Sequence, residues 1–381
     1  MLAAALAALG ALSAAAWLAI ALRPARSWDL RPVGEGEPWP AAPQQWPRAA
    51  IVVPAHDEAD QLPRTLPALL AQDYPGEWRV VVVDDRSSDG TAAVARSLGD
   101  SRLQVVDGEA LPPRWAGKVW AMAQGVAAAP DAAYLLLTDA DITHVPSSLR
   151  RLVAESERAG LGLNSRMARL RTVSAPERLL IPPFLFFFNL LYPMRLVNRP
   201  GRTAAAAGGC VLVRRSALEA AGGMEAIRSE VIDDVNLAAA IKRAGASIRL
   251  SVSRGDVTSL REYRSLRTIW RMVKRTAFTE LRFSWLLLAG TLLGLCLLFL
   301  APPLVAVAGV GSFGLAGGWR LLLVALGVAG WAVMAMLLAP TERLYGLSPL
   351  WALTFPLGGL LYGAMTLDSA IHHALRRGPE W

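Results

Sequence analysis

Hydrophobic residues gather at the two ends of this 381-residue chain, and short apolar runs alternate with helical patterns between them. From Met1 to Leu22 the only polar side chain is Ser13. A segment of about 20 such residues is enough to span a bilayer core about 30 Å thick. Beyond residue 283 the chain is hydrophobic again, with candidate spans at about 285–309, 319–339 and 349–367. The pattern predicts an N-terminal transmembrane anchor over 1–22, a linker over 23–48 that is rich in Pro, Trp and Gly, and a C-terminal multi-span membrane region over 283–381.

The first segment has a competing interpretation as a cleaved signal peptide. It lacks a charged region at its start, and it continues into arginines rather than a clear cleavage site. The interpretation adopted here is therefore a retained anchor.

Basic residues flank the inner edges of both hydrophobic regions, at Arg23, Arg26, Arg31, Arg271, Lys274, Arg275 and Arg282. The positive-inside rule then puts the central domain on the cytoplasmic side of a bacterial inner membrane, and the loop from Gly311 to Gly318 outside. Three C-terminal spans would leave Arg376 and Arg377 outside, against the same rule. Either the segment with Pro356 is re-entrant, or the stretch broken by Pro302 and Pro303 is not a simple span.

The region 49–282 shows strand-like and helical patterns in alternation. Strands are expected at 49–53, 78–83, 103–106 and 134–137, and helices at 62–70, 91–98 and 119–128. Strands that alternate with helices predict an α/β fold with a mainly parallel sheet, which binds ligands beyond the carboxyl ends of its strands.

Composition excludes several classes of protein. The chain is 54% hydrophobic with a mean hydropathy of +0.35, which is too apolar for an ordinary soluble enzyme. Its net charge of +8 comes mostly from arginines near the membrane edges and in the central domain, and attraction to anionic lipid headgroups explains them more simply than nucleic acid does. The two cysteines imply no disulfide framework, and no Cys/His spacing suits zinc.

Acidic residues follow two of the expected strands and open a later helical pattern. Asp84 and Asp85 follow one strand, Asp139 and Asp141 follow another, and a further pair is Asp233-Asp234. Helix capping is an alternative for the first pair. Two carboxylates two residues apart repel each other unless a cation lies nearby, so Asp139 and Asp141 favour a divalent metal over a cap.

Several short motifs, in a fixed order, resemble the family 2 glycosyltransferases. They are Val53-Pro54-Ala55-His56-Asp57-Glu58, Val83-Asp84-Asp85-Arg86-Ser87-Ser88-Asp89-Gly90-Thr91, Gly117-Lys118, Thr138-Asp139-Ala140-Asp141, and Asp233-Asp234 with Leu237 and Ala244-Gly245. The resemblance covers most of residues 49–275. It implies a GT-A domain, a Rossmann-like nucleotide-sugar-binding fold, flanked here by transmembrane helices, and a transfer that inverts the anomeric carbon of a nucleotide-sugar donor.

The resemblance also implies roles for single residues. Pro54, Ala55 and Glu58 would line the nucleotide pocket, with Asp84, Asp85, Lys118 and Asp139 also at the nucleotide sugar. Asp139 and Asp141 would hold a divalent cation, Mg²⁺ or Mn²⁺, and Asp234 would be the general base. Charge neutralisation of a leaving diphosphate and a proton acceptor for the attacking hydroxyl are what such a transfer needs.

The chain departs from the family at two places. Asp233 stands where Glu is usual, which keeps the charge. The segment Trp270-Arg271-Met272-Val273-Lys274-Arg275-Thr276 has only the arginine of the Gln-x-x-Arg-Trp motif of processive synthases. Asp233 and Arg275 remain candidates for contact with the acceptor or the diphosphate, and a basic interfacial helix explains the segment about as well.

Within the segment 177–197, the stretch from Leu179 to Met194 is rich in Phe and Leu, contains three prolines and, at about 16 residues, is short for a span. It predicts an interfacial or re-entrant insert beside the active site, with core packing inside the domain as the alternative. This insert, Ala207-Gly208-Gly209-Cys210, Arg275-Thr276-Ala277-Phe278 and the end Arg376-Arg377-Gly378-Pro379-Glu380-Trp381 are similar to the bacterial hopene-associated glycosyltransferases. That likeness implies a lipid acceptor such as a hopanoid.

Other functions remain open at the level of sequence. A polyprenyl-phosphate sugar transferase would share the donor site but would not need a strong base, and a polysaccharide synthase is a further alternative. A degenerate transferase acting as a membrane scaffold is the non-enzyme alternative, and the full set of donor-side carboxylates argues against it. A dehydrogenase is disfavoured because no G-x-G-x-x-G follows the first strand.

Overall fold

The computed structural model describes residues 1–30, 32–33, 40–311 and 317–375, and these form two compact units. One unit consists of Met1–Leu30, Thr172–Pro193 and Tyr263–Trp381, and the other of Arg31–Arg171 and Met194–Glu262. The expectations for Arg31, for linker residues 34–39, for the interior of the Gly311–Gly318 loop, and for Arg376, Arg377 and the rest of the C-terminal end lie outside the described residues.

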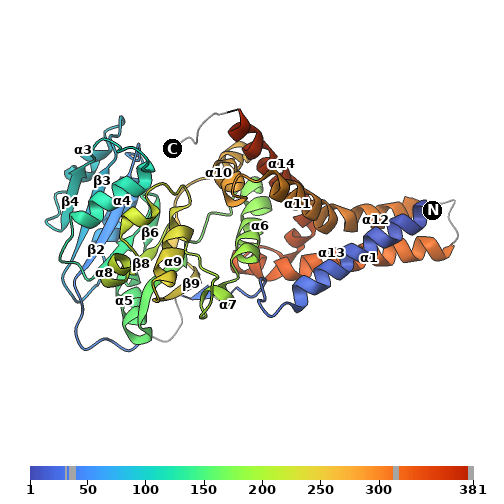
Figure 1. The fold of residues 1–381 in the computed structure, drawn as a ribbon, viewed down its shortest axis with the longest axis horizontal. Helices are drawn as coiled ribbons and strands as arrows, with labels where there is room; N and C mark the ends of the chain where they lie inside the picture. The colour runs from blue at the N-terminus through green and yellow to red at the C-terminus, as the bar shows by residue number, and fades with distance from the viewer. Residues whose placement is uncertain (31, 34–39, 312–316, 376–381) are drawn as a thin grey trace. The chain divides into compact units, whose positions relative to one another are not determined.

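The second unit is an α/β domain built on an eight-stranded sheet in the order β1-β9-β7-β8-β5-β2-β3-β4 (Figure 1). Only β8 runs antiparallel to its neighbours among the described pairs. The strands are β1 Pro32–Val33, β2 Ala49–Ala55, β3 Trp78–Asp84, β4 Leu103–Asp107, β5 Tyr134–Leu137, β7 Leu161–Met167, β8 Val211–Arg214 and β9 Ser247–Ser253. The helices are α2 Leu62–Leu70, α3 Thr91–Ser97, α4 Gly117–Ala127, α5 Ser148–Ala159, α7 Met194–Val197, α8 Arg215–Ala220, the 3₁₀ helix η1 Met224–Ile227, and α9 Asp233–Arg243.

Both faces of the sheet are covered, because successive side chains of a strand point to opposite sides. Ile51 and Val53 of β2 join a buried cluster with leucines of α2 and α5. Val52, between them, lies against α4 on the other face. This arrangement explains why the central strands are continuous apolar runs.

The α/β expectation is confirmed, and the strands and helices expected between residues 49 and 128 and at 134–137 are present with small shifts of their ends. The helical pattern that Asp233-Asp234 opens is α9. Part of the expected linker, Pro32–Val33, forms β1 beside β9.

A second, two-stranded sheet lies outside the main one. It pairs β6 (Ile142–His144) antiparallel with β10 (Val257–Ser259), and Ser259 is opposite Ile142. Because β6 directly follows Asp141, this pairing brings residues 259–261 to that carboxylate.

The first unit consists of helices. They are α1 Leu2–Leu22, α6 Ala175–Leu191, α10 Leu266–Glu280, α11 Trp285–Leu295, the π turn η2 Cys296–Leu300, α12 Ala301–Gly311, α13 Gly317–Leu344, the 3₁₀ helix η3 Pro349–Thr354, and α14 Phe355–Ala374. Figure 1 shows α1, α12 and α13 side by side, in agreement with their contacts. Five segments of the described chain are long and apolar enough to cross a membrane: Leu2–Leu22, Ala175–Val197, Trp285–Gly311, Gly317–Leu344 and Pro349–Ala374.

Pro302 leaves a gap in the backbone hydrogen bonding of the helix from Trp285 to Gly311. Proline has no N–H, so the carbonyl four residues earlier, that of Leu298, has no α-helical donor. The buried indole of Trp17 in α1 donates to this carbonyl at 2.6 Å. In an apolar surrounding an unpaired carbonyl is costly, so this bond ties α1 to the π turn.

An aromatic cluster surrounds this bond. Phe186 and Phe187 of α6 pack with Trp17, Phe299 and Phe355. The phenylalanine-rich segment therefore belongs to the helical unit rather than to the core of the α/β domain, so the alternative of core packing inside that domain was wrong.

Candidate active site

Lys118 lies between two of the acidic signals. It is the second residue of α4, and its Nζ is 2.7 Å from Oδ1 of Asp139 and 3.3 Å from Oδ2 of Asp233. Burial opposes its charge, but the nearby carboxylates of Asp139 and Asp233 outweigh that effect and raise the pKa of Lys118. One ammonium group thus links the carboxylates that follow β5 to those that open α9.

Asp234 is the second residue of α9, and both of its carboxylate oxygens accept backbone hydrogen bonds. Oδ2 accepts from Gly208 N–H at 2.7 Å, and Oδ1 from Val235 N–H at 2.8 Å. Burial, followed by the charge of Asp233, raises the pKa of Asp234 to about 7, while Lys118 and the two N–H groups oppose the shift. A carboxyl group with this pKa can accept a proton near neutral pH, as a general base must.

Gly208 lies beside the side chains of Lys118, Asp234 and Asp139. A Cβ atom at this position would be 3.3 Å from Nζ of Lys118, 3.5 Å from Oδ2 of Asp234 and 3.8 Å from Oδ2 of Asp139. The position of the next residue, Gly209, is fixed by a hydrogen bond, since Oγ1 of Thr138 donates to the carbonyl of Gly209 at 2.7 Å. The absent side chain keeps the three polar groups within reach of one another.

Asp141 and Glu58 share a cation. Oδ2 of Asp141 accepts from Oγ of Ser259 at 2.8 Å and from Nε of Arg261 at 3.3 Å, and Nη2 of the same arginine donates to Oε1 of Glu58 at 2.7 Å. Burial raises the pKa of Glu58, Arg261 lowers it, and the charges of Asp141 and Asp139 raise it further. The carboxylates of Asp139 and Asp141 therefore lie close enough to that of Glu58 to repel it.

Asp84 and Asp85 lie at the carboxyl end of β3 beside the end of β2, with Ala55 paired to Asp84. Both are buried, and in the described structure Oδ1 of each has no hydrogen-bond partner. Burial raises the pKa of Asp85. Buried carboxylate oxygens without donors are expensive, and they are suited to a ligand that brings N–H or O–H groups.

The loops after β2 and β3 hold each other by reciprocal hydrogen bonds. Asp57 N–H donates to Oγ of Ser87 at 2.9 Å, and Ser88 N–H donates to Oδ1 of Asp57 at 2.7 Å. Glu58 N–H donates to Oγ1 of Thr91 at 2.9 Å. The polar residues after Asp85 thus fix the position of Glu58.

The side chains of this site could supply only some of the ligands of the expected divalent cation. Within the described residues no three His, Cys, Asp or Glu side chains converge as metal ligands. The groups present are carboxylate oxygens, which Mg²⁺ and Mn²⁺ prefer, and Oδ1 of Asp141 is not used by Ser259 or Arg261. The residues suit a cation that takes its remaining ligands from a diphosphate and water.

The structure brings nearly all of the expected site residues into one unit, with Pro54 and Ala55 at the buried end of β2. Arg275 is the exception. It is exposed on α10 in the helical unit, where Arg267, Arg271 and Arg275 form a stripe at i, i+4 and i+8. Sequence reasoning gave no role to Gly208 in catalysis, and it missed Ser259 and Arg261.

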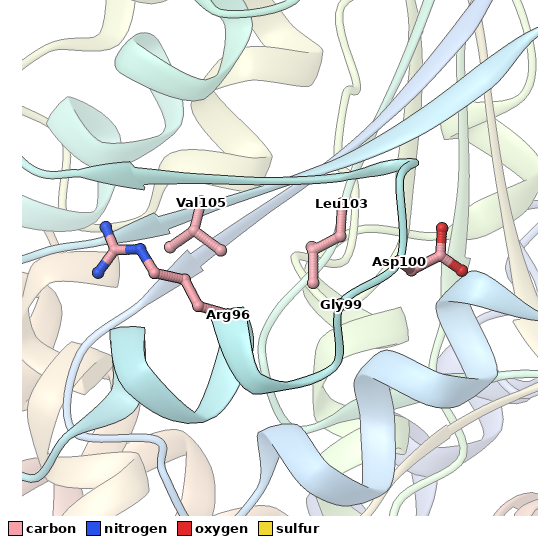
Figure 2. Close-up of a pocket in the computed structure, with 5 residues that line it drawn as sticks. All are labelled: Arg96, Gly99, Asp100, Leu103 and Val105. Carbon is pink, nitrogen blue, oxygen red and sulfur yellow. The ribbon is translucent and has the colours of Figure 1, made fainter.

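The cavity drawn in Figure 2 is not part of this site. It has a volume of about 170 Å³ and is lined by Arg96, Gly99, Asp100, Leu103 and Val105, at the start of the edge strand β4 and the end of α3. None of the expected site residues lines it.

Comparisons with known proteins agree with this fold. Residues 50–222 match the family model described as glycosyl transferase family 2. The whole chain resembles the structure of the mannosyltransferase PcManGT from Pyrobaculum calidifontis in complex with GDP-Man and Mn²⁺, with a TM-score of 0.56, 20% identity and coverage of 98% of this chain and 99% of that one.

Two curated relatives match shorter stretches. The succinoglycan biosynthesis protein ExoO of Rhizobium meliloti is 34% identical over 121 residues, which are 32% of this chain and 33% of the relative. The 4,4'-diaponeurosporenoate glycosyltransferase of Staphylococcus aureus is 37% identical over 93 residues, 24% of each protein. The chain thus spans a third or less of the length of these relatives. The motifs, the sheet and these matches together identify residues 50–222 as a glycosyl transferase family 2 domain with the GT-A fold.

Proposed function

We propose that the protein is a membrane-bound inverting glycosyltransferase that moves a sugar from a nucleotide-sugar donor to a lipid acceptor. The observation that supports this most directly is Lys118, which links Asp139 on the expected donor side to Asp233 beside the base Asp234. A donor phosphate and an acceptor hydroxyl bound on either side of this ammonium group would be brought together for transfer.

The proposed reaction uses the groups in fixed roles. The carboxylates of Asp84 and Asp85 accept hydrogen bonds from N–H or O–H groups of the nucleoside, and Lys118 neutralises charge on the leaving diphosphate. Asp234 accepts the proton of the acceptor hydroxyl while that oxygen attacks the anomeric carbon and the diphosphate leaves from the opposite face. Asp139 and Asp141 would hold Mg²⁺ or Mn²⁺ together with oxygens of the diphosphate and water, and the ion would supply further charge neutralisation to the leaving group when it is bound.

A lipid acceptor is proposed from the surface of the helical unit. Large apolar side chains are exposed along its helices, among them Leu286, Leu293, Leu353 and Leu360. A surface of this kind suits lipid. The name of the S. aureus relative includes a glycosyl acceptor, 4,4'-diaponeurosporenoate, while the R. meliloti relative is named for succinoglycan biosynthesis. A hopanoid remains the acceptor that the sequence resemblance favours.

The segment α6 is proposed to dip into the membrane without crossing it. The chain enters it from β7 and returns to β8, and these two strands are paired in one sheet. A single crossing would leave β7 and β8 on opposite sides of the bilayer, which their hydrogen bonds forbid. Although Ala175–Val197 is long enough to span, the interfacial or re-entrant insert expected over 177–197 is therefore retained.

The last apolar segment is also proposed to be re-entrant. After α13 ends at Leu344, the chain turns back, since Trp331 Nε1 donates to the carbonyl of Leu353 at 3.1 Å and Ala352 packs with Leu337. α14 then runs antiparallel to α11, with Gly359 facing Phe299 and Phe283 stacked on His373.

Both ends of this segment therefore lie on the side where α13 ends and α11 begins. Three crossings remain, by α1, by α11 to α12, and by α13. This topology removes the conflict with the positive-inside rule, because Arg376 and Arg377 follow α14 directly in the sequence. The α/β domain and the C-terminus are thus proposed to be cytoplasmic.

Fusions test the topology. Green fluorescent protein after Trp381 is expected to fluoresce, and alkaline phosphatase at the same place is expected to be inactive. Phosphatase fused after Gly311 serves as the control and is expected to be active. An active phosphatase after Trp381 would show that α14 crosses.

An assay with lipid tests the reaction. Detergent-solubilised protein with Mg²⁺ or Mn²⁺ and a panel of nucleotide sugars is incubated with bacterial lipid extract, and lipid masses are followed. A lipid that gains one sugar, with loss of the product on chelation, supports the proposal. Polymer formation would favour polysaccharide synthesis, and the absence of any donor turnover would favour the scaffold.

Two variants separate the roles of the carboxylates. Asp141→Asn is expected to abolish transfer and to weaken metal-dependent donor binding, while Asp234→Asn abolishes transfer and leaves donor binding intact. Equal donor affinity in both variants and the parent would overturn this division. High residual activity of Asp234→Asn would favour a polyprenyl-phosphate acceptor, whose phosphate oxygen needs no strong base.

A further inference from the structure

Arg261 is the exposed member of a cluster in which two side-chain cations meet several carboxylates. Its guanidinium joins Asp141 to Glu58, while Lys118 joins Asp139 to Asp233. The Arg261 side chain is 48% exposed, whereas those of Glu58 and Asp141 are 16% and 10% exposed. The arginine approaches the cluster from solvent, and the acids that it neutralises are largely enclosed.

The register of the small sheet determines this contact. β10 pairs with β6 so that Ser259 is opposite Ile142, and Leu260 N–H donates to the carbonyl of Asp141 at 2.8 Å. The backbone on both sides is fixed. The side chain of Arg261 is long and half in water, so its guanidinium can leave Asp141 without unfolding the strand pair.

Without a cation the three carboxylates of Glu58, Asp139 and Asp141 would repel one another in a partly buried site. Arg261 supplies positive charge at Oδ2 of Asp141, one of the two residues expected to hold the divalent metal. A metal ion that arrives alone would have to compete with this charge. A metal ion that arrives with a diphosphate brings an anion that the guanidinium can bind instead, in the bidentate manner that suits phosphate.

We propose that Arg261 occupies the charge position of the divalent cation in the donor-free protein and moves to the diphosphate when metal and donor bind together. The inference rests on the proposed function, and it adds an order of binding to it: bare metal binds weakly, and metal with nucleotide binds well. Arg261 is a positioning residue for Asp141 in the first state and a ligand of the diphosphate in the second.

The test measures binding rather than transfer. Mn²⁺ binding to the purified full chain in detergent is followed by electron paramagnetic resonance, and GDP and UDP binding in saturating Mn²⁺ by calorimetry. Arg261→Gln is expected to tighten binding of Mn²⁺ alone by about fivefold or more, because a competing charge is removed, and to weaken diphosphate binding by about fivefold or more. Arg261→Lys keeps the charge without the fork, so its affinity for Mn²⁺ alone is expected to stay near that of the parent.

Arg102→Gln is the matched control. Arg102 is also half-exposed and pairs with Asp100 through Nε and Nη2, but it lies at the start of β4, away from the cluster. The substitution removes the same charge as Arg261→Gln, and it is expected to change neither the affinity for Mn²⁺ alone nor the affinity for the diphosphates.

The outcomes distinguish this inference from the proposed function. Unchanged or weaker Mn²⁺ binding in Arg261→Gln, with the thermal unfolding temperature preserved, would show that Arg261 does not occupy the charge position of the divalent cation. Unchanged diphosphate binding in Arg261→Gln would show that Arg261 does not move to the diphosphate. If Arg261→Gln does not fold, Arg261→Lys decides, since a fall in diphosphate affinity without a change in Mn²⁺ affinity is expected. Failure of the parent to bind either diphosphate with Mn²⁺ would instead contradict the proposed function.

Discussion

The backbone N–H of Gly208 donates to Oδ2 of Asp234 at 2.7 Å, and no side chain separates the two residues. This bond orients the proposed base from outside its own helix. Asp234 would otherwise be positioned only by its place in the first turn of α9 and by Val235 N–H.

Gly208→Ala is expected to reduce kcat by about tenfold to a hundredfold, because the added methyl group approaches Lys118 and Asp234 and displaces the base from the acceptor. Donor affinity should change little. Gly290→Ala is the control, since a Cβ there meets nothing within 4 Å. Steady-state kinetics of both variants make the comparison, and an unchanged kcat in Gly208→Ala would show that the bond does not orient the base.

The rate of transfer should depend on the ionisation of Asp234. Its pKa is raised to about 7, and a base works only when ionised, so the rate should fall about tenfold per pH unit below 7 and level off above it. The measurement is kcat between pH 5.5 and 8.5 at saturating donor. Asp234→Asn should lose this dependence in its residual activity, and a flat profile in the parent would contradict the assignment.

Asp85→Asn should stabilise the ligand-free protein while weakening nucleotide binding. Burial raises the pKa of Asp85, so this carboxyl costs stability as the pH rises above its ordinary value of 3.8. A neutral amide avoids that cost at pH 7, with a gain of about 1 kcal/mol. Thermal unfolding at pH 7 and pH 4 checks the sign: the gain should shrink at pH 4, and equal gains at both would point to a cause other than charge.

Arg166 should be essential for the stability of the α/β domain. Its side chain is fully buried and pairs with Glu155 at 2.5 Å and with Asp256. Arg166→Leu would leave two carboxylates with no cation, and breaking a buried pair in this way costs about 3–5 kcal/mol. Chemical unfolding of the solubilised protein measures the loss. Arg102→Gln, which breaks an exposed pair, should change the free energy of unfolding by less than about 1 kcal/mol.

The donor side of the site could be expected from the sequence because its residues follow strands. Asp84, Asp85 and Asp139 each come directly after an apolar run, and a parallel sheet brings such ends to one edge. The position of Asp234 followed only from the family resemblance, since nothing in its local pattern shows that Lys118 lies beside it.

The contacts of Asp141 could not be expected in the same way. Ser259 and Arg261 are 118 and 120 residues away in the chain, and they arrive through the pairing of two three-residue strands. Strands this short have no alternation of polar and apolar residues that sets a register. The apolar run from Leu179 to Met194 is short for a span, but the helical segment is longer than that run, because it begins at Ala175 and continues through Pro182 and Pro183.

The bond from Trp17 to Leu298 joins residues that are 281 positions apart. The first helix is synthesised long before the carbonyl that it serves. If the helices insert as proposed, the first one waits in the bilayer with the indole N–H of Trp17 unpaired until the helix with Pro302 is inserted beside it. In the proposed topology, retention of the first helix would therefore be a requirement for assembling the later ones, because without its indole the carbonyl of Leu298 would be unpaired in lipid.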